Sequence, residues 1–89
     1  MKIIHKITLS VGERTYDLPK SSVLLSARFQ RDEMQAWYMF DASDKEKKRI
    51  TLVVNVTGSR FDDEGWTYLG SDMSKDHAFV GHVFFRREP

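Results

Sequence analysis

Apolar side chains recur at every second residue along most of this sequence, and that spacing limits the folds open to it. The clearest run is residues 50–57, where Ile, Leu, Val and Val alternate with Thr, Val, Asn and Thr. Such alternation is typical of a β-strand, because successive side chains of a strand point to opposite faces of its sheet. Comparable runs occupy residues 3–9, 15–18, 23–30, 34–40, 66–69 and 78–85.

A helix over residues 22–40 is the main alternative, since Ala, Met, Gln and Leu in this stretch favour helices. Helical spacing from Leu24 would place Arg28 and Asp32 on the apolar side, so strands are favoured. Pro19 has no amide to donate and should end the second strand. Gly70 should end the strand over residues 66–69, and the charged connection 41–49 should be mobile.

About seven short strands separated by turn residues predict an all-β fold, either a small antiparallel β-sandwich or a partly open barrel. The length of 89 residues predicts a single domain, residues 1–89.

Composition narrows the class of protein further. With 40% hydrophobic residues and a net charge of +1, the chain lacks the composition of a disordered protein. It contains no Cys, which excludes a disulfide framework, a zinc-thiolate site and a Cys nucleophile. No segment approaches the roughly 20 apolar residues of a membrane helix, and no signal peptide is evident. We expect a small soluble cytoplasmic domain without membrane contact.

Catalytic signals are weak. None of the serines lies in a Gly-x-Ser-x-Gly turn, and His5, His77 and His82 lack the spacing of a helix-borne metal site. His82 has apolar neighbours on its own face and is expected to be a core histidine with satisfied hydrogen bonds. The sequence therefore predicts no enzyme, no cofactor and no metal.

Two of the expected strands, residues 34–40 and 78–85, are apolar on both faces, whereas a half-solvated antiparallel strand should alternate. Either these strands are central and covered on both sides, or one face meets another chain. The second case predicts a non-enzymatic protein that binds a partner protein through an apolar β surface, with Trp37 or Trp66 as anchor. The small core also makes a homodimer or higher oligomer plausible.

Two alternatives concern residues 57–68. Residues 57–60 read Thr-Gly-Ser-Arg, in which Ser59 and Arg60 could hold a phosphate. With Trp66 they predict a site for a phosphorylated nucleotide across a subunit interface. Trp66 and Tyr68 could instead stack the bases of a single-stranded nucleic acid near the basic run 45–49. The near-zero net charge argues against nucleic acid, because phosphate neutralisation supplies most of that affinity.

Several segments together resemble a family of small uncharacterised proteins that is frequent in phage genomes. The best-marked are Thr57-Gly58, the Tyr-Leu-Gly of residues 68–70 and the His-Val-Phe of residues 82–84. Relatives favour a Gly and a His where this chain has Val56 and Ser59. The resemblance covers nearly the whole chain. It implies a compact β fold and a phage setting, in which small accessory proteins often bind and inhibit host defence proteins.

Overall fold

Seven strands and no helix make up the computed structural model, which describes all 89 residues. Residues 22–40 form two strands of a hairpin, so the helical alternative is excluded. Pro19 ends its strand as expected. The strands are β1 (Lys2–Leu9), β2 (Gly12–Pro19), β3 (Val23–Gln30), β4 (Glu33–Asp41), β5 (Lys47–Val56), β6 (Thr67–Met73) and β7 (Val80–Arg87).

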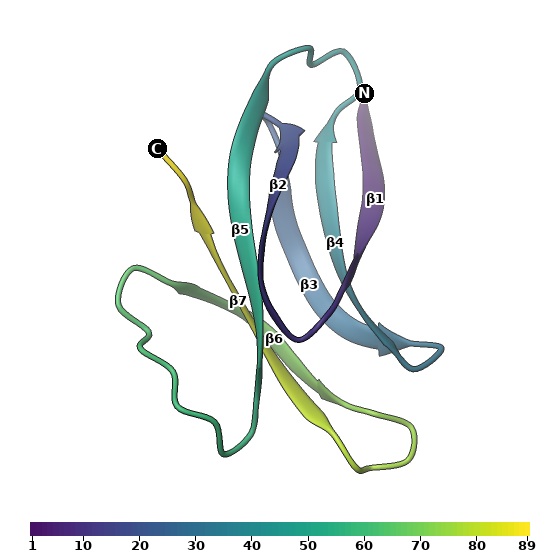
Figure 1. Ribbon diagram of the computed structural model, residues 1–89. Helices are drawn as coiled ribbons and strands as arrows, with labels where there is room; N and C mark the ends of the chain where they lie inside the picture. The colour runs from purple at the N-terminus through teal and green to yellow at the C-terminus, as the bar shows by residue number, and fades with distance from the viewer.

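The strands form two antiparallel sheets (Figure 1). One has three strands in the order β1-β4-β3, and the other has four in the order β2-β5-β7-β6. The sheets pack on each other, and the edge strands β3 and β6 come into contact, while no closed barrel forms. The all-β prediction is therefore confirmed, with two packed sheets rather than a closed cylinder.

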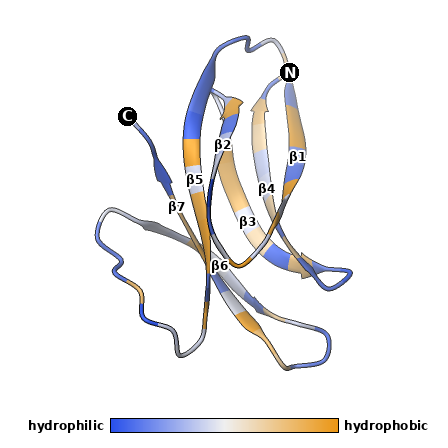
Figure 2. Ribbon diagram, in the orientation of Figure 1, coloured by the Kyte–Doolittle hydropathy of each residue, from blue (hydrophilic) through white to orange (hydrophobic).

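The core lies between the two sheets, where one face of each strand is buried. Leu52 on β5 and Val83 on β7 are its most completely enclosed large side chains. Figure 2 shows the corresponding apolar bands on the central parts of the strands, with hydrophilic residues toward several strand ends. The buried cluster consists of Leu9, Leu18, Ala27, Met34, Ala36, Ile50, Leu52, Val54 and Val83.

A close seam joins β3 to β6, and it corrects the prediction that Gly70 ends a strand. β6 continues through Gly70 to Met73, and its register against β7 shifts between Tyr68 and Gly70. A Cβ atom at Gly70 would lie 3.1 Å from the carbonyl oxygen of Ala27 on β3. Because Gly70 has no side chain, the backbones of β3 and β6 can approach each other closely at this point.

The connection between β4 and β5 is ordered by hydrogen bonds, contrary to the mobile loop expected from its charge. The backbone N–H of Ser21 donates to Asp44 at 2.7 Å, and the N–H of Asp41 donates to the Ser21 hydroxyl at 2.9 Å. The Glu46 carbonyl accepts from the amide of Lys20. These bonds tie the connection to the turn between β2 and β3, and β5 begins at Lys47 rather than after the basic run.

Asp72 should contribute measurably to stability, because its carboxylate bridges the β3–β6 seam. The backbone N–H of Phe29 donates to Asp72 Oδ2 at 2.9 Å, and this bond, followed by that from the Met73 amide, holds the pKa of Asp72 below its ordinary value of 3.8. Replacing Asp72 by Ala should lower the free energy of unfolding by about 1–2 kcal/mol at pH 7 in urea denaturation.

The same bond predicts the acid dependence. Because the pKa of Asp72 is lower in the folded chain, the unfolded chain binds the proton first as the pH falls. The stabilisation is complete above pH 3.8, decreases below it, and is lost once the pH passes the folded-state pKa. The difference between wild type and Asp72→Ala should therefore shrink at low pH. Asp63→Ala is the control, because the exposed Asp63 carboxylate accepts no hydrogen bond. Equal losses of stability in the two variants would contradict the role given to Asp72.

Candidate binding surfaces

The two strands that are apolar on both faces are both central in their sheets. β4 lies between β1 and β3, and β7 lies between β5 and β6. In each strand one face contributes to the core, through Ala36 and Val83 respectively. Their outer faces differ in whether other residues of the protein cover them, and the candidate binding surfaces follow from that difference.

The outer face of β7 is covered by the loop between β5 and β6. The Phe84 ring lies 4.6 Å from the centroid of Phe61 in that loop and 5.3 Å from Tyr68 on β6. Phe61 in turn contacts Trp66, with their ring centroids 5.9 Å apart. The apolar outer face of β7 is thus used within the protein.

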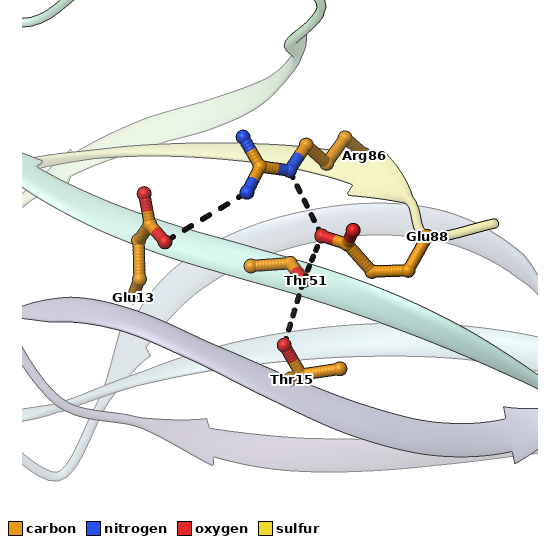
Figure 3. Close-up of polar contacts among 5 residues, drawn as sticks. All are labelled: Glu13, Thr15, Thr51, Arg86 and Glu88. Atoms are coloured by element: carbon orange, nitrogen blue, oxygen red, sulfur yellow. Dashed lines mark hydrogen bonds and ion pairs between the residues drawn. The ribbon is translucent and has the colours of Figure 1, made fainter.

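A polar network on β2, β5 and β7 lies beside this aromatic cover. Figure 3 shows its members, Glu13, Thr15, Thr51, Arg86 and Glu88. The guanidinium of Arg86 lies 4.3 Å from the centroid of the Trp66 ring and pairs with Glu88 at 2.9 Å and Glu13 at 3.9 Å. The buried Thr51 hydroxyl donates to Glu88 and lies 2.7 Å from that of Thr15. The hydrogen bonds from Thr51 and then Arg86 lower the pKa of Glu88.

Arg86 is therefore shared between two carboxylates and an aromatic ring, and it is the cation that contacts Trp66. Neither Arg60 nor the basic run takes that position. The cation beside Trp66 is thus one that is already paired with two carboxylates.

A chain of four polar side chains crosses the outer face beside the aromatic cover. His82 Nε2 lies 2.7 Å from the Thr57 hydroxyl, and Nδ1 lies 2.6 Å from the Ser71 hydroxyl, which is 2.7 Å from the phenol of Tyr68. His82 is half-buried on the outer face, so the prediction of a core histidine is wrong, although both ring nitrogens are hydrogen-bonded.

This polar chain brings together the three segments that carry the resemblance. Thr57 belongs to the Thr-Gly pair, Tyr68 to the Tyr-Leu-Gly segment and His82 to the His-Val-Phe segment. Sequence reasoning named Tyr68 but missed the roles of Thr57 and Ser71. The only sequence signal for these two residues is that Thr57 belongs to one segment of the resemblance and Ser71 directly follows another. Strand spacing alone does not show that β6 lies beside β7.

The loop at residues 57–60 is held by hydrogen bonds to β7 and within its own turn. The amide of Thr57 donates to the carbonyl of Val80, and the amide of Ser59 donates to that of Val56, with Gly58 at a φ of +92°. The Thr57 amide is used by this bond to β7 and the Ser59 amide by the turn itself, so neither points toward an anion. The side chains of Ser59 and Arg60 are exposed and make no hydrogen bond or ion pair.

The outer face of the three-stranded sheet presents an apolar patch without a covering element. On β1 and β4, Ile4 pairs with Met39, and Trp37 lies on the same face because the adjacent Ala36 points into the core. Val23 also pairs with Met39, and the bulge in β3 adds Leu25 next to Ser26, opposite Trp37. We call this patch the Trp37 face; it consists of Ile4, Val23, Leu25, Trp37 and Met39.

The Trp37 face is accessible and bordered by positive charge. Ile4, Val23 and Leu25 are 55%, 54% and 44% exposed. Lys2, Lys6 and Arg28 lie on the same side of the sheet, and none of them forms an ion pair. Trp37 thus lies on the opposite side of the molecule from Ser59, Arg60, Trp66 and Tyr68, and the five candidate residues do not form one site.

Comparisons with known proteins agree with an uncharacterised family. The structure contains no helix that could span a membrane, and no group of three His, Asp or Glu side chains is placed to hold a metal ion. A search of the curated proteins and a search of the solved structures found no match. The family model described as a domain of unknown function, DUF7352, matches residues 1–89, and the chain belongs to that family.

Proposed function

We propose that this chain is a non-enzymatic binding protein that docks a partner protein on the Trp37 face. The observation that carries the proposal is the contrast between the two central strands. The outer face of β7 is covered by Phe61 and Trp66. The outer face of β4 instead carries the half-buried Trp37 and Met39 beside the exposed Ile4, Val23 and Leu25. Contiguous exposed apolar surface on a small domain usually marks an interaction site, and a central Trp is a common anchor.

The charge around the patch indicates the chemistry of the partner. Lys2, Lys6 and Arg28 leave the border of the Trp37 face positively charged. Two carboxylates, Glu33 and Asp41, lie on the same side at the ends of β4, so three cations face two anions there. Asp41 is ionised at neutral pH, because hydrogen bonds from Ser43 hold its pKa below its ordinary value of 3.8. A second copy of this chain would bring the same cations together, which opposes a symmetric dimer on this face. The partner that fits is a different protein with an apolar docking surface and acidic residues around it.

The resemblance to small proteins of phage genomes supplies a setting for this interaction. In that setting the chain is an accessory protein of the phage, and its partner is a host protein, such as a defence component, that the contact inhibits. This part of the proposal rests on the resemblance, while the location of the docking surface rests on the exposed side chains.

Quantitative capture with matched variants tests the proposal. The immobilised wild-type protein should retain one partner from host extract, and that partner, once purified, should be titrated in a calorimeter. Replacing Trp37 by Ala should weaken its affinity about 30-fold, since a central aromatic anchor contributes about 2 kcal/mol or more. Val23→Ser, which removes an exposed side chain of the same face, should weaken it about 5-fold.

The control is Met73→Ser, which removes an apolar side chain of similar exposure, 48%, from β6 on the other sheet. All variants should first show the circular dichroism spectrum of the wild type. Loss of affinity in Met73→Ser together with normal binding by Trp37→Ala and Val23→Ser would refute the proposed surface.

A further inference from the structure

An open cavity of about 840 Å³ lies at one end of the molecule, and no residue of the Trp37 face lines it. Three turns surround it, those joining β1 to β2, β3 to β4 and β6 to β7, and all three lie in the lower half of the view in Figure 1. Its volume falls within the range of small-molecule sites, which are usually concave, mostly apolar and lined by a few polar groups.

The inner part of the cavity is apolar and well packed. Phe29 and Phe79 meet edge to face with centroids 5.7 Å apart, and Leu9, Met34 and Val54 complete the lining there. The position of Phe79 is fixed, because its amide donates to the Ser74 hydroxyl and its carbonyl accepts from the Ser74 amide. This region offers a preformed surface for an apolar group rather than for a polar one.

The mouth of the cavity carries excess negative charge. Asp32, Glu33 and Asp76 line it, against Lys75 as the only cation in the lining. None of the three carboxylates forms an ion pair. Hydrogen bonds from the Ser74 hydroxyl and then the Ala78 amide hold the pKa of Asp76 below its ordinary value of 3.8, so this group is ionised at neutral pH.

From this combination we propose that the cavity binds a small organic ammonium ion with an apolar body. The apolar body lies against Phe29 and Phe79, and the ammonium group lies among the carboxylates at the mouth. A neutral ligand would leave the carboxylates without a partner, and an anionic one would be repelled by them. The site is independent of the Trp37 face, so either proposal can fail without the other.

A matched ligand series tests the charge preference directly. 4-Phenylbutylammonium, 4-phenylbutanol and 5-phenylpentanoate share one phenylbutyl body and differ in the charge of the head group. Titrated into ¹⁵N-labelled protein, the ammonium should shift the amide signals of Ala78 and Phe79 and leave the indole signal of Trp37 in place. It should bind at least about fivefold more tightly than the alcohol at low salt, and added salt should reduce the difference.

The variant Asp32→Asn separates binding from folding. Asp32 has a φ of +64° in the two-residue turn between β3 and β4, a conformation that Asn tolerates as well as Asp does. Asp32→Asn should therefore leave stability unchanged and weaken the ammonium about two- to fivefold while leaving the alcohol unaffected. Phe79→Ala should weaken the ammonium and the alcohol alike.

Two results would overturn the proposal. One is equal affinity for all three ligands, because the carboxylates would then not contribute. The other is the absence of any shift at Ala78 and Phe79 with millimolar ammonium in a wild-type protein whose spectrum is otherwise that of a folded domain.

Discussion

Alanine in place of Trp66 is expected to lower the free energy of unfolding by about 2–3 kcal/mol. A fully buried aromatic residue costs about 3–5 kcal/mol when truncated to Ala, and Trp66 is half-buried. The substitution removes the contact with Phe61 and the stacking of Arg86, and the latter contributes about 0.5–1 kcal/mol in exposed positions. Urea denaturation followed by circular dichroism measures the change.

Trp37→Ala provides the comparison, because Trp37 is also half-buried but has no layer above it. Its substitution should cost less than half as much stability as that of Trp66. Such a difference would separate Trp66, which stabilises the fold, from Trp37, which the proposed function makes the anchor for a partner. Equal losses in the two variants would mean that the Trp37 face is packed as tightly as the covered face, and the proposed function would lose its main support.

Valine in place of Gly70 is expected to destabilise the protein by about 2–3 kcal/mol. Its Cβ atom would lie 3.1 Å from the carbonyl oxygen and 3.4 Å from the backbone nitrogen of Ala27. Backbone atoms of a paired strand cannot move aside as the end of a flexible side chain can, so β3 and β6 would have to separate. The midpoint of urea denaturation should fall accordingly, and Gly70→Ala should show a smaller loss of the same sign.

Thr67→Val is the matched control for this substitution. Thr67 is exposed on the same strand, and Val favours the strand conformation, so stability should change by less than about 0.5 kcal/mol. If Gly70→Val were as stable as the control, the seam between β3 and β6 would not be close-packed, and the relative placement of the two sheets would need revision.

The strands themselves could be predicted from the sequence because their signal is local. Alternation over 50–57 needs only the pleat of the chain and one buried face, and β5 indeed places Leu52 and Val54 in the core. Strand ends were harder to predict. Gly70 was expected to end β6, since a lone glycine commonly interrupts a strand, but the close approach of Ala27 is a tertiary contact that no local pattern reports.

The candidate surfaces depend on which strands are neighbours, and the sequence left that question open. The sequence shows that residues 34–40 and 78–85 are apolar on both faces. It does not show which of the two outer faces is covered by other residues. The answer came from the loop between β5 and β6, whose Phe61 reaches Phe84. The polar chain through His82 depends likewise on β6 lying beside β7. Both the cover on β7 and the polar chain through His82 therefore depend on interactions between distant segments rather than on strand propensity.

The two indole N–H signals of this protein test the central claim most directly, because one tryptophan lies on each outer face. In ¹⁵N-labelled protein they are assigned with Trp37→Phe and Trp66→Phe variants, and the purified partner is then titrated. We expect the Trp37 signal to shift or broaden with increasing partner while the Trp66 signal stays in place. A Trp66 signal that moves while that of Trp37 does not would contradict the account and assign binding to the four-stranded sheet.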